Sequence, residues 1–178
     1  MAQLQISLKR IAIVLLSVAV VLCILLTVAF LRSRPPREKD LIQNFYSHRA
    51  AYEQLKDMLR QDKQVLRVAN WGIETTGSPF PTPAEGKLPP GRYEEYVALL
   101  KQINGSWAFR DRGEHPEVVG VGVWASGFGG DTRHIQICWV DQAPANQVAS
   151  LDDYYRRATR PRDVYRHIDD NWYLFADW

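Results

Sequence analysis

The feature that most constrains this chain is an uncharged, mostly apolar run close to its start. Residues 11–31 read IAIVLLSVAVVLCILLTVAFL and include no charged side chain. As an α-helix this run would be about 32 Å long, which matches the thickness of the hydrocarbon core of a bilayer. Because a helix satisfies its own backbone hydrogen bonds in lipid, the sequence predicts a transmembrane helix over residues 11–31.

The charge of the chain divides at nearly the same place. Among the 178 residues, 22 are Lys or Arg and 20 are Asp or Glu. Residues 1–37 hold five of the basic residues and none of the acidic ones, so residues 38–178 carry a net charge of −3. We therefore predict four segments, namely a basic N-terminal tail (1–10), the transmembrane helix (11–31), a joint rich in Arg and Pro (32–37) and a soluble domain (38–178).

The apolar run has a competing interpretation, and its orientation in a membrane is open. A cleaved signal peptide has an apolar core of about 7–15 residues, which is shorter than this run, although Thr27-Val28-Ala29 resembles a cleavage site. An uncleaved signal anchor of a single-pass membrane protein is therefore favoured. The basic residues after the run favour a cytoplasmic domain, whereas the short basic tail before it is typical of anchors that export the domain.

Helix and strand patterns alternate along residues 38–178. Apolar residues at a spacing of three to four predict helices over about 38–63 and 92–103, and Ser150 with Asp153 forms a capping pattern that begins a short helix. Period-two patterns predict the strands, which cover residues 65–75 with a bulge near Asn70, 106–110, 117–125, 132–140, 164–168 and 172–178. This order predicts an α+β fold, in which a mainly antiparallel sheet is covered by two amphipathic helices.

The sequence predicts no cofactor, no metal and no nucleic-acid partner. The motif GVGVWA at residues 120–125 matches the letters of a dinucleotide fingerprint, but its glycines lie inside a predicted strand instead of opening a helix. We expect these glycines to let a helix or an aromatic ring lie close to the sheet. The four histidines lack the spacing of metal ligands, and the net negative charge of residues 38–178 disfavours binding to nucleic acid.

Asp131, His134 and His167 are the residues that would support acid–base chemistry if the fold brought them together. Asp131 and His134 follow a Gly-rich turn, and His167 lies on a later predicted strand. Cys138 is four residues from His134, about 13 Å along a strand, so we expect an inert, buried thiol. This set leaves a small membrane-anchored hydrolase as the alternative function.

Loop tips favour a binding function instead. Residues 76–90 contain five prolines, and a loop of this length in a compact domain is commonly functional. Phe80 in this loop, together with Phe128 and Arg133 near the Gly-rich turn, are the predicted partner contacts. The main prediction is a membrane-tethered, non-enzymatic interaction module that contacts the lipid bilayer through residues 11–31 and binds a protein or an envelope component.

Four short motifs in residues 41–178 resemble those of small uncharacterised bacterial envelope proteins, some anchored by a helix and some by lipid. The matching residues are Leu55, Met58 and Asp62; Tyr96, Leu99 and Leu100; Ser150, Leu151 and Asp152; and Asn171, Trp172, Tyr173 and Leu174. The resemblance implies an α+β fold and an extracytoplasmic, periplasmic-side domain, with a cytoplasmic-facing domain as the alternative. It implies no catalytic residue and no cofactor.

Overall fold

The computed structural model of the chain describes residues 15–25, 27–28, 34–111, 117–127, 132–156 and 163–177. The chain divides into two compact units, Met1–Pro35 and Pro36–Trp178.

The predicted transmembrane helix over residues 11–31 is wrong. Residues 15–25 and 27–28 are helical, but no helix in the described part of the chain is both long enough and apolar enough to cross a bilayer. A span takes about 20 consecutive apolar residues in one helix. The single-pass membrane location, the signal anchor and both orientations depended on that span, and they are corrected with it.

The second unit is built on one antiparallel sheet of eight strands, with the order β3-β2-β1-β4-β5-β6-β8-β7. The strands are β1 (Val65–Ala69), β2 (Gly72–Thr75), β3 (Ser78–Thr82), β4 (Trp107–Arg110), β5 (Val118–Ser126), β6 (Arg133–Val140), β7 (Val164–Asp169) and β8 (Trp172–Asp177). The two long strands predicted over residues 117–125 and 132–140 are confirmed and form a hairpin, in which β5 pairs with β6 from Val118↔Val140 to Ser126↔Arg133. The α+β arrangement of this unit agrees with the prediction.

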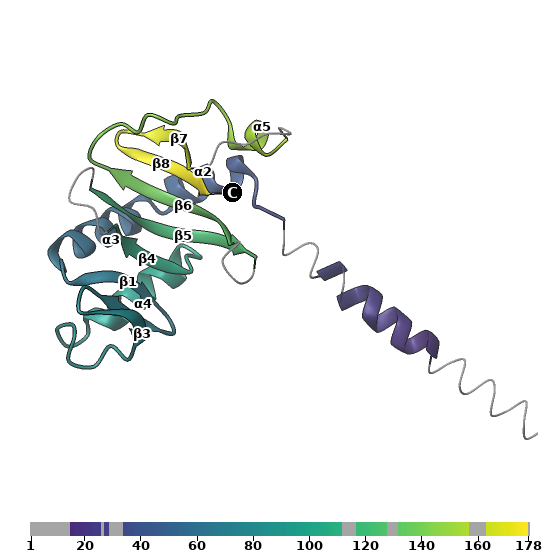
Figure 1. Ribbon diagram of the computed structural model, residues 1–178, viewed down its shortest axis with the longest axis horizontal. Coiled ribbons are helices and arrows are strands. Elements are labelled where there is room, and N and C mark those ends of the chain that lie inside the picture. The colour runs from purple at the N-terminus through teal and green to yellow at the C-terminus, as the bar shows by residue number, and fades with distance from the viewer. Residues whose placement is uncertain are drawn as a thin grey trace, which may run out of the picture. The chain divides into compact units, whose positions relative to one another are not determined.

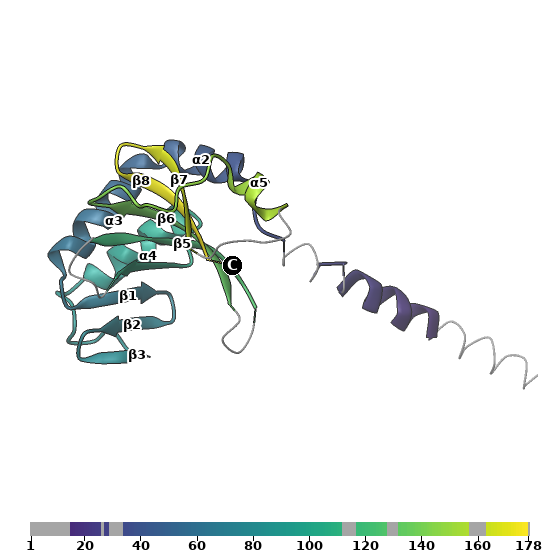
Figure 2. The ribbon, with the colours of Figure 1, turned by 45° about the horizontal axis from the view of Figure 1, so that its top comes forward.

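Helices α2 (Glu38–Ser47), α3 (Arg49–Gln61) and α4 (Arg92–Gln102) pack on one face of the sheet, and a short helix α5 (Leu151–Tyr155) precedes β7 (Figures 1 and 2). The helix predicted over residues 38–63 is two helices that meet at His48. There the backbone leaves the helical region (φ −126°), and the His48 ring lies 3.0 Å from the Asn44 carbonyl oxygen.

The strand predicted over residues 65–75 is a hairpin and not a bulged strand. β1 and β2 pair in the register Ala69↔Gly72, so the chain reverses at Asn70 and Trp71. Gly72 has a φ of +146°, and a Cβ there would lie 2.8 Å from the Thr82 carbonyl oxygen. A side chain is excluded at Gly72 by both conditions, and the turn carries Trp71 to the end of the hairpin.

The prolines of residues 76–90 are partly in a strand. Ser78–Thr82 forms β3, the edge strand next to β2, where Thr75 pairs with Ser78 and Ile73 with Thr82. Pro79 and Pro81 have no N–H to donate, which is tolerated on an edge strand because one side of it has no partner strand. A further strand would find few donors on this edge, so β3 ends the sheet.

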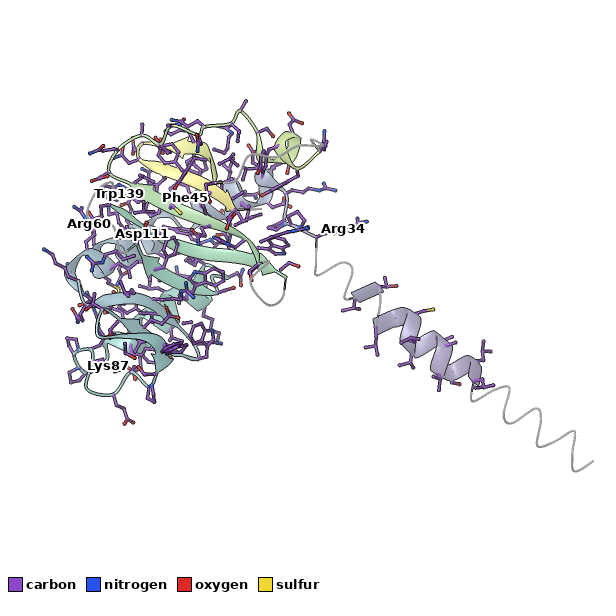
Figure 3. All side chains as sticks on the ribbon, in the orientation of Figure 1. Arg34, Phe45, Arg60, Lys87, Asp111 and Trp139 are labelled. Atoms are coloured by element: carbon purple, nitrogen blue, oxygen red, sulfur yellow. The ribbon has the colours of Figure 1, made fainter. Side chains whose placement is uncertain are left out.

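The core lies between the sheet and the three long helices. Its largest fully buried side chains come from both layers, and they include Phe45, Tyr52, Ile135, Ile137 and Trp172. Figure 3 labels Phe45, and it labels Arg60 near Trp139. The Arg60 guanidinium lies 4.8 Å from the centre of the Trp139 ring. This cation–π contact covers the Trp139 ring at the edge of the core.

Candidate binding groove

The glycine motif at residues 120–125 lies in strand β5, as predicted, and it serves packing. A Cβ on Gly122 would lie 2.0 Å from Cε2 of Trp107, its partner in β4. A Cβ on Gly120 would lie 2.5 Å from the Ile137 carbonyl oxygen. The expectation that an aromatic ring lies close to the sheet here is therefore confirmed.

The two candidate catalytic histidines are not brought together. On β8, His134 is opposite Asp177 and His167 is opposite Tyr173, from strands on the two sides of β8. Four residues along β8 correspond to about 13 Å, and two strand spacings add about 10 Å across the sheet. Asp131, the third member of the set, lies outside the described residues.

Each histidine has its own local environment. His134 Nδ1 lies 3.8 Å from Asp177 Oδ2, and its ring centre is 5.7 Å from that of Phe175. Burial lowers the pKa of His134 below its ordinary value, which favours the neutral ring. His167 Nε2 lies 2.8 Å from the Asp170 carbonyl oxygen. Each histidine therefore contacts a neighbour in its own part of the sheet, and neither contacts the other.

Within the described ranges no group of three or more His, Cys, Asp and Glu side chains is arranged to hold a metal ion.

Cys138 lies on the sheet face away from the helices, in a small cluster with Val140 and Tyr173 that Phe109, Val118, Tyr165 and Phe175 surround. Its side chain is 1% exposed. Burial raises the pKa of the Cys138 thiol, so the reactive thiolate is disfavoured. The structure therefore agrees with an inert thiol.

Thiol labelling tests this assignment. In the native chain, Cys23 is exposed and Cys138 is buried, so a chromogenic disulfide reagent should label one thiol quickly. We expect Cys138 to react on the order of a thousandfold more slowly, because it must wait for the domain to open. The Cys23→Ser variant is the control and should show no fast phase. A fast phase that persists in this variant would contradict the assignment.

The predicted partner contacts do not form one surface. Phe80 on β3 is 76% exposed, and Arg133 is exposed at the start of β6. Five strand spacings separate β3 from β6 in the sheet order, which is about 24 Å. Phe128 lies outside the described residues. Phe80 is adjacent in sequence to Pro81, which lines a hollow in the described surface.

That hollow is a groove with a volume of about 760 Å³. It lies at the edge of the sheet that β3 forms. It is lined by the β1–β2 turn (70–72), by most of residues 81–91 and by Tyr93 and Glu94 at the start of α4. Phe80 directly precedes the lining residue Pro81. We call this hollow the Trp71 groove. Its volume is in the range typical of ligand sites.

Trp71 separates this groove from a second hollow. Its side chain is 54% exposed, and it also lines a space of about 500 Å³ beside Leu100, Lys101 and Asn104 of the α4 end. Sequence reasoning missed Trp71 because it placed this residue inside a strand. The signal that was available is Asn70-Trp71-Gly72, in which a polar residue and a glycine flank the tryptophan as in a tight turn.

The walls of the Trp71 groove are held by hydrogen bonds. The Tyr93 hydroxyl donates to the Ala69 carbonyl oxygen (2.8 Å), which ties α4 to the hairpin. The Thr82 hydroxyl lies 3.3 Å from the Ile73 carbonyl oxygen, and the Lys87 ammonium donates to the same hydroxyl. The prolines of the loop limit its backbone further. The shape of the groove is therefore held by contacts within the chain.

The residues that carry the resemblance to bacterial envelope proteins serve packing. Asp62 Oδ2 accepts hydrogen bonds from Arg92 Nε (2.8 Å) and from the Tyr96 hydroxyl (3.0 Å), which joins α3 to α4. Trp172 Nε1 donates to Glu53 Oε1 (2.9 Å). No protein-family model, curated protein or solved structure matches this chain. The resemblance therefore stays a prediction.

Proposed function

We propose that residues 36–178 form a non-enzymatic interaction module that binds a partner protein at the Trp71 groove. The observation that carries this proposal is the 54% exposure of Trp71 between two hollows. Tryptophan is enriched among the residues that contribute most to protein–protein binding, because a large ring gains much area when it is covered.

Two further features support the proposal. Tyr46, Trp71 and Phe80 are the large hydrophobic side chains exposed in the described part of this unit. Trp71 lines the groove, and Phe80 directly precedes the lining residue Pro81. Residues 83–91 connect β3 to α4 without regular strand or helix, and such connections on a rigid scaffold commonly carry binding residues. The hydrolase alternative gains no comparable support, because His134 and His167 lie apart.

Site-specific photo-crosslinking tests the proposal. A photoreactive phenylalanine analogue is placed at position 80, next to the groove, in the full chain expressed in its source cells. We expect one discrete crosslinked product, which should be lost when Trp71→Ala is added. The matched control carries the analogue at position 46, where Tyr46 is 52% exposed on α2.

The outcomes at the two positions distinguish specific crosslinking at the groove from non-specific crosslinking at any exposed aromatic position. A product from position 80 and none from position 46 supports the groove. Equal products from both positions, or a product from position 80 that Trp71→Ala leaves unchanged, would overturn the proposal. So would the absence of any product from position 80.

A further inference from the structure

The acidic character of the Trp71 groove limits what binds there. Among the described residues that line it, Glu85 and Glu94 are the charged ones. Neither carboxylate pairs with a basic side chain in the described residues. Lys87 belongs to the same loop but is not among the lining residues, and its ammonium donates to the Thr82 hydroxyl (Figure 3). The groove therefore presents two carboxylates to a ligand, with the Lys87 ammonium held at its wall on Thr82.

Two neighbouring acids, Asp62 and Glu95, share one basic partner, Arg92. Arg92 Nε lies 2.8 Å from Asp62 Oδ2, and Arg92 Nη1 lies 3.1 Å from Glu95 Oε2. Glu95 also accepts from Gln54 Nε2 at 2.7 Å. Glu94 on α4 and Glu85 on the loop are the two carboxylates that line the groove.

The aromatic rings of the groove suit the same kind of ligand. Trp71 is exposed and Tyr93 lines the wall. A guanidinium group stacks on the face of an aromatic ring and forms two parallel hydrogen bonds with a carboxylate. An ammonium group gains less from both contacts, because it is compact and strongly hydrated. The combination of an open tryptophan with two carboxylates therefore favours arginine over lysine.

The edge strand excludes one common way of binding an extended segment. Pro79 and Pro81 of β3 offer no N–H groups, so a partner strand cannot extend the sheet here with a regular ladder. Affinity must come from side chains placed in the groove.

We propose that the Trp71 groove binds an extended, arginine-containing segment of a partner protein. An arginine of that segment stacks on Trp71, and its guanidinium pairs with Glu94 or Glu85. This inference depends on the proposed function and adds the chemical class of the partner to it.

Fluorescence anisotropy with defined peptides tests the inference on the full chain. The probe is a labelled twelve-residue Gly/Ser peptide with three arginines, and its counterparts carry three lysines or three glutamines in the same places. We expect the arginine peptide to bind about tenfold more tightly than the glutamine peptide, and the lysine peptide to lie between them.

Variants locate the binding site. Glu85→Gln with Glu94→Gln should weaken binding of the arginine peptide about tenfold, and Trp71→Ala should weaken it about fivefold. The charge-matched control is Asp57→Asn with Asp153→Asn, whose side chains are 61% and 67% exposed elsewhere. The control for the ring is Tyr46→Ala. Both controls should stay within about twofold of the parent chain, since screening weakens distant charges.

The inference is overturned if the arginine and glutamine peptides bind equally, if neither binds, or if the charge-matched control weakens binding as much as the groove variants. Failure of this inference is distinguishable from failure of the proposed function. A crosslinked product at position 80 that depends on Trp71, without arginine preference, leaves the interaction module in place and removes the partner class. If the Trp71-dependent crosslinked product and the arginine preference are both absent, the interaction module and the partner class are both refuted.

Discussion

The Trp172→Ala variant should lose about 3–5 kcal/mol of its free energy of unfolding. Trp172 is 2% exposed in β8, and its ring centre lies 5.3 Å from that of Phe45 and 6.0 Å from that of Tyr52. Alanine would leave a cavity between the sheet and two helices that cannot collapse without moving both layers. A loss of this size is a large part of the stability of a typical domain, and urea unfolding followed by circular dichroism measures it.

Two other tryptophan variants give this prediction its control. Trp172→Phe keeps most of the apolar volume and removes the indole N–H that donates to Glu53, whose carboxylate also pairs with Lys56. It should cost about 1–2 kcal/mol. Trp71→Ala removes an exposed ring and should change stability by less than about 0.5 kcal/mol. If Trp172→Ala and Trp71→Ala cost the same, the described core is wrong.

Short-range patterns in the sequence predicted the elements that local chemistry determines. Ser150 begins α5 as the capping pattern indicates, since its hydroxyl accepts from the Asp153 N–H at 3.3 Å. The β5–β6 hairpin follows from two period-two runs around a Gly-rich turn. Helix α4 ends where Asn104 adopts a φ of +54°, as Asn-Gly predicts. In each case the residues that determine the element lie within one turn or hairpin.

Local sequence patterns could not predict which strands pair when those strands are distant in sequence. The sheet places β4 beside β1 and β8 beside β6, and neither pair is consecutive in sequence. The turn at Asn70 and Trp71 was interpreted as a bulge, because both interpretations change the alternation of apolar residues in the same way. Only the partner strand distinguishes them. The apolar run over residues 11–31 shows a similar limit, since hydropathy alone does not fix the length of a helix.

The residues of the candidate site also differ in whether local sequence patterns could identify them. Phe80 was identified because it lies in a long, Pro-rich segment of the kind that is commonly functional, and its side chain is exposed. Trp71, Glu85 and Glu94 were missed because each looks ordinary in its own stretch of sequence. They share a groove only after β1, β2 and α4 have packed. A binding site assembled from a turn, a loop and a helix start has no single motif.

The Gly122→Ala variant should lose about 2–3 kcal/mol, although it adds one methyl group. A Cβ at this position would lie 2.0 Å from Cε2 of Trp107 and 2.2 Å from Cζ2, so the indole must leave the sheet. Trp107 also lies beneath the Arg67 guanidinium, 6.0 Å from the ring centre, and a shift of the ring disturbs this contact too. Thermal and urea unfolding of the full chain measure the loss.

A second substitution shows whether the clash is the cause. Trp107→Ala alone should be destabilising, but adding Gly122→Ala to it should cost at least about 1 kcal/mol less than in the parent, because the clashing ring is gone. Gly77→Ala is the matched control, since nothing lies within 4 Å of a Cβ there, and it should be neutral within about 0.5 kcal/mol. Strict additivity of the Gly122 and Trp107 substitutions, or equal losses for Gly122→Ala and Gly77→Ala, would mean that the glycine does not make room for the ring.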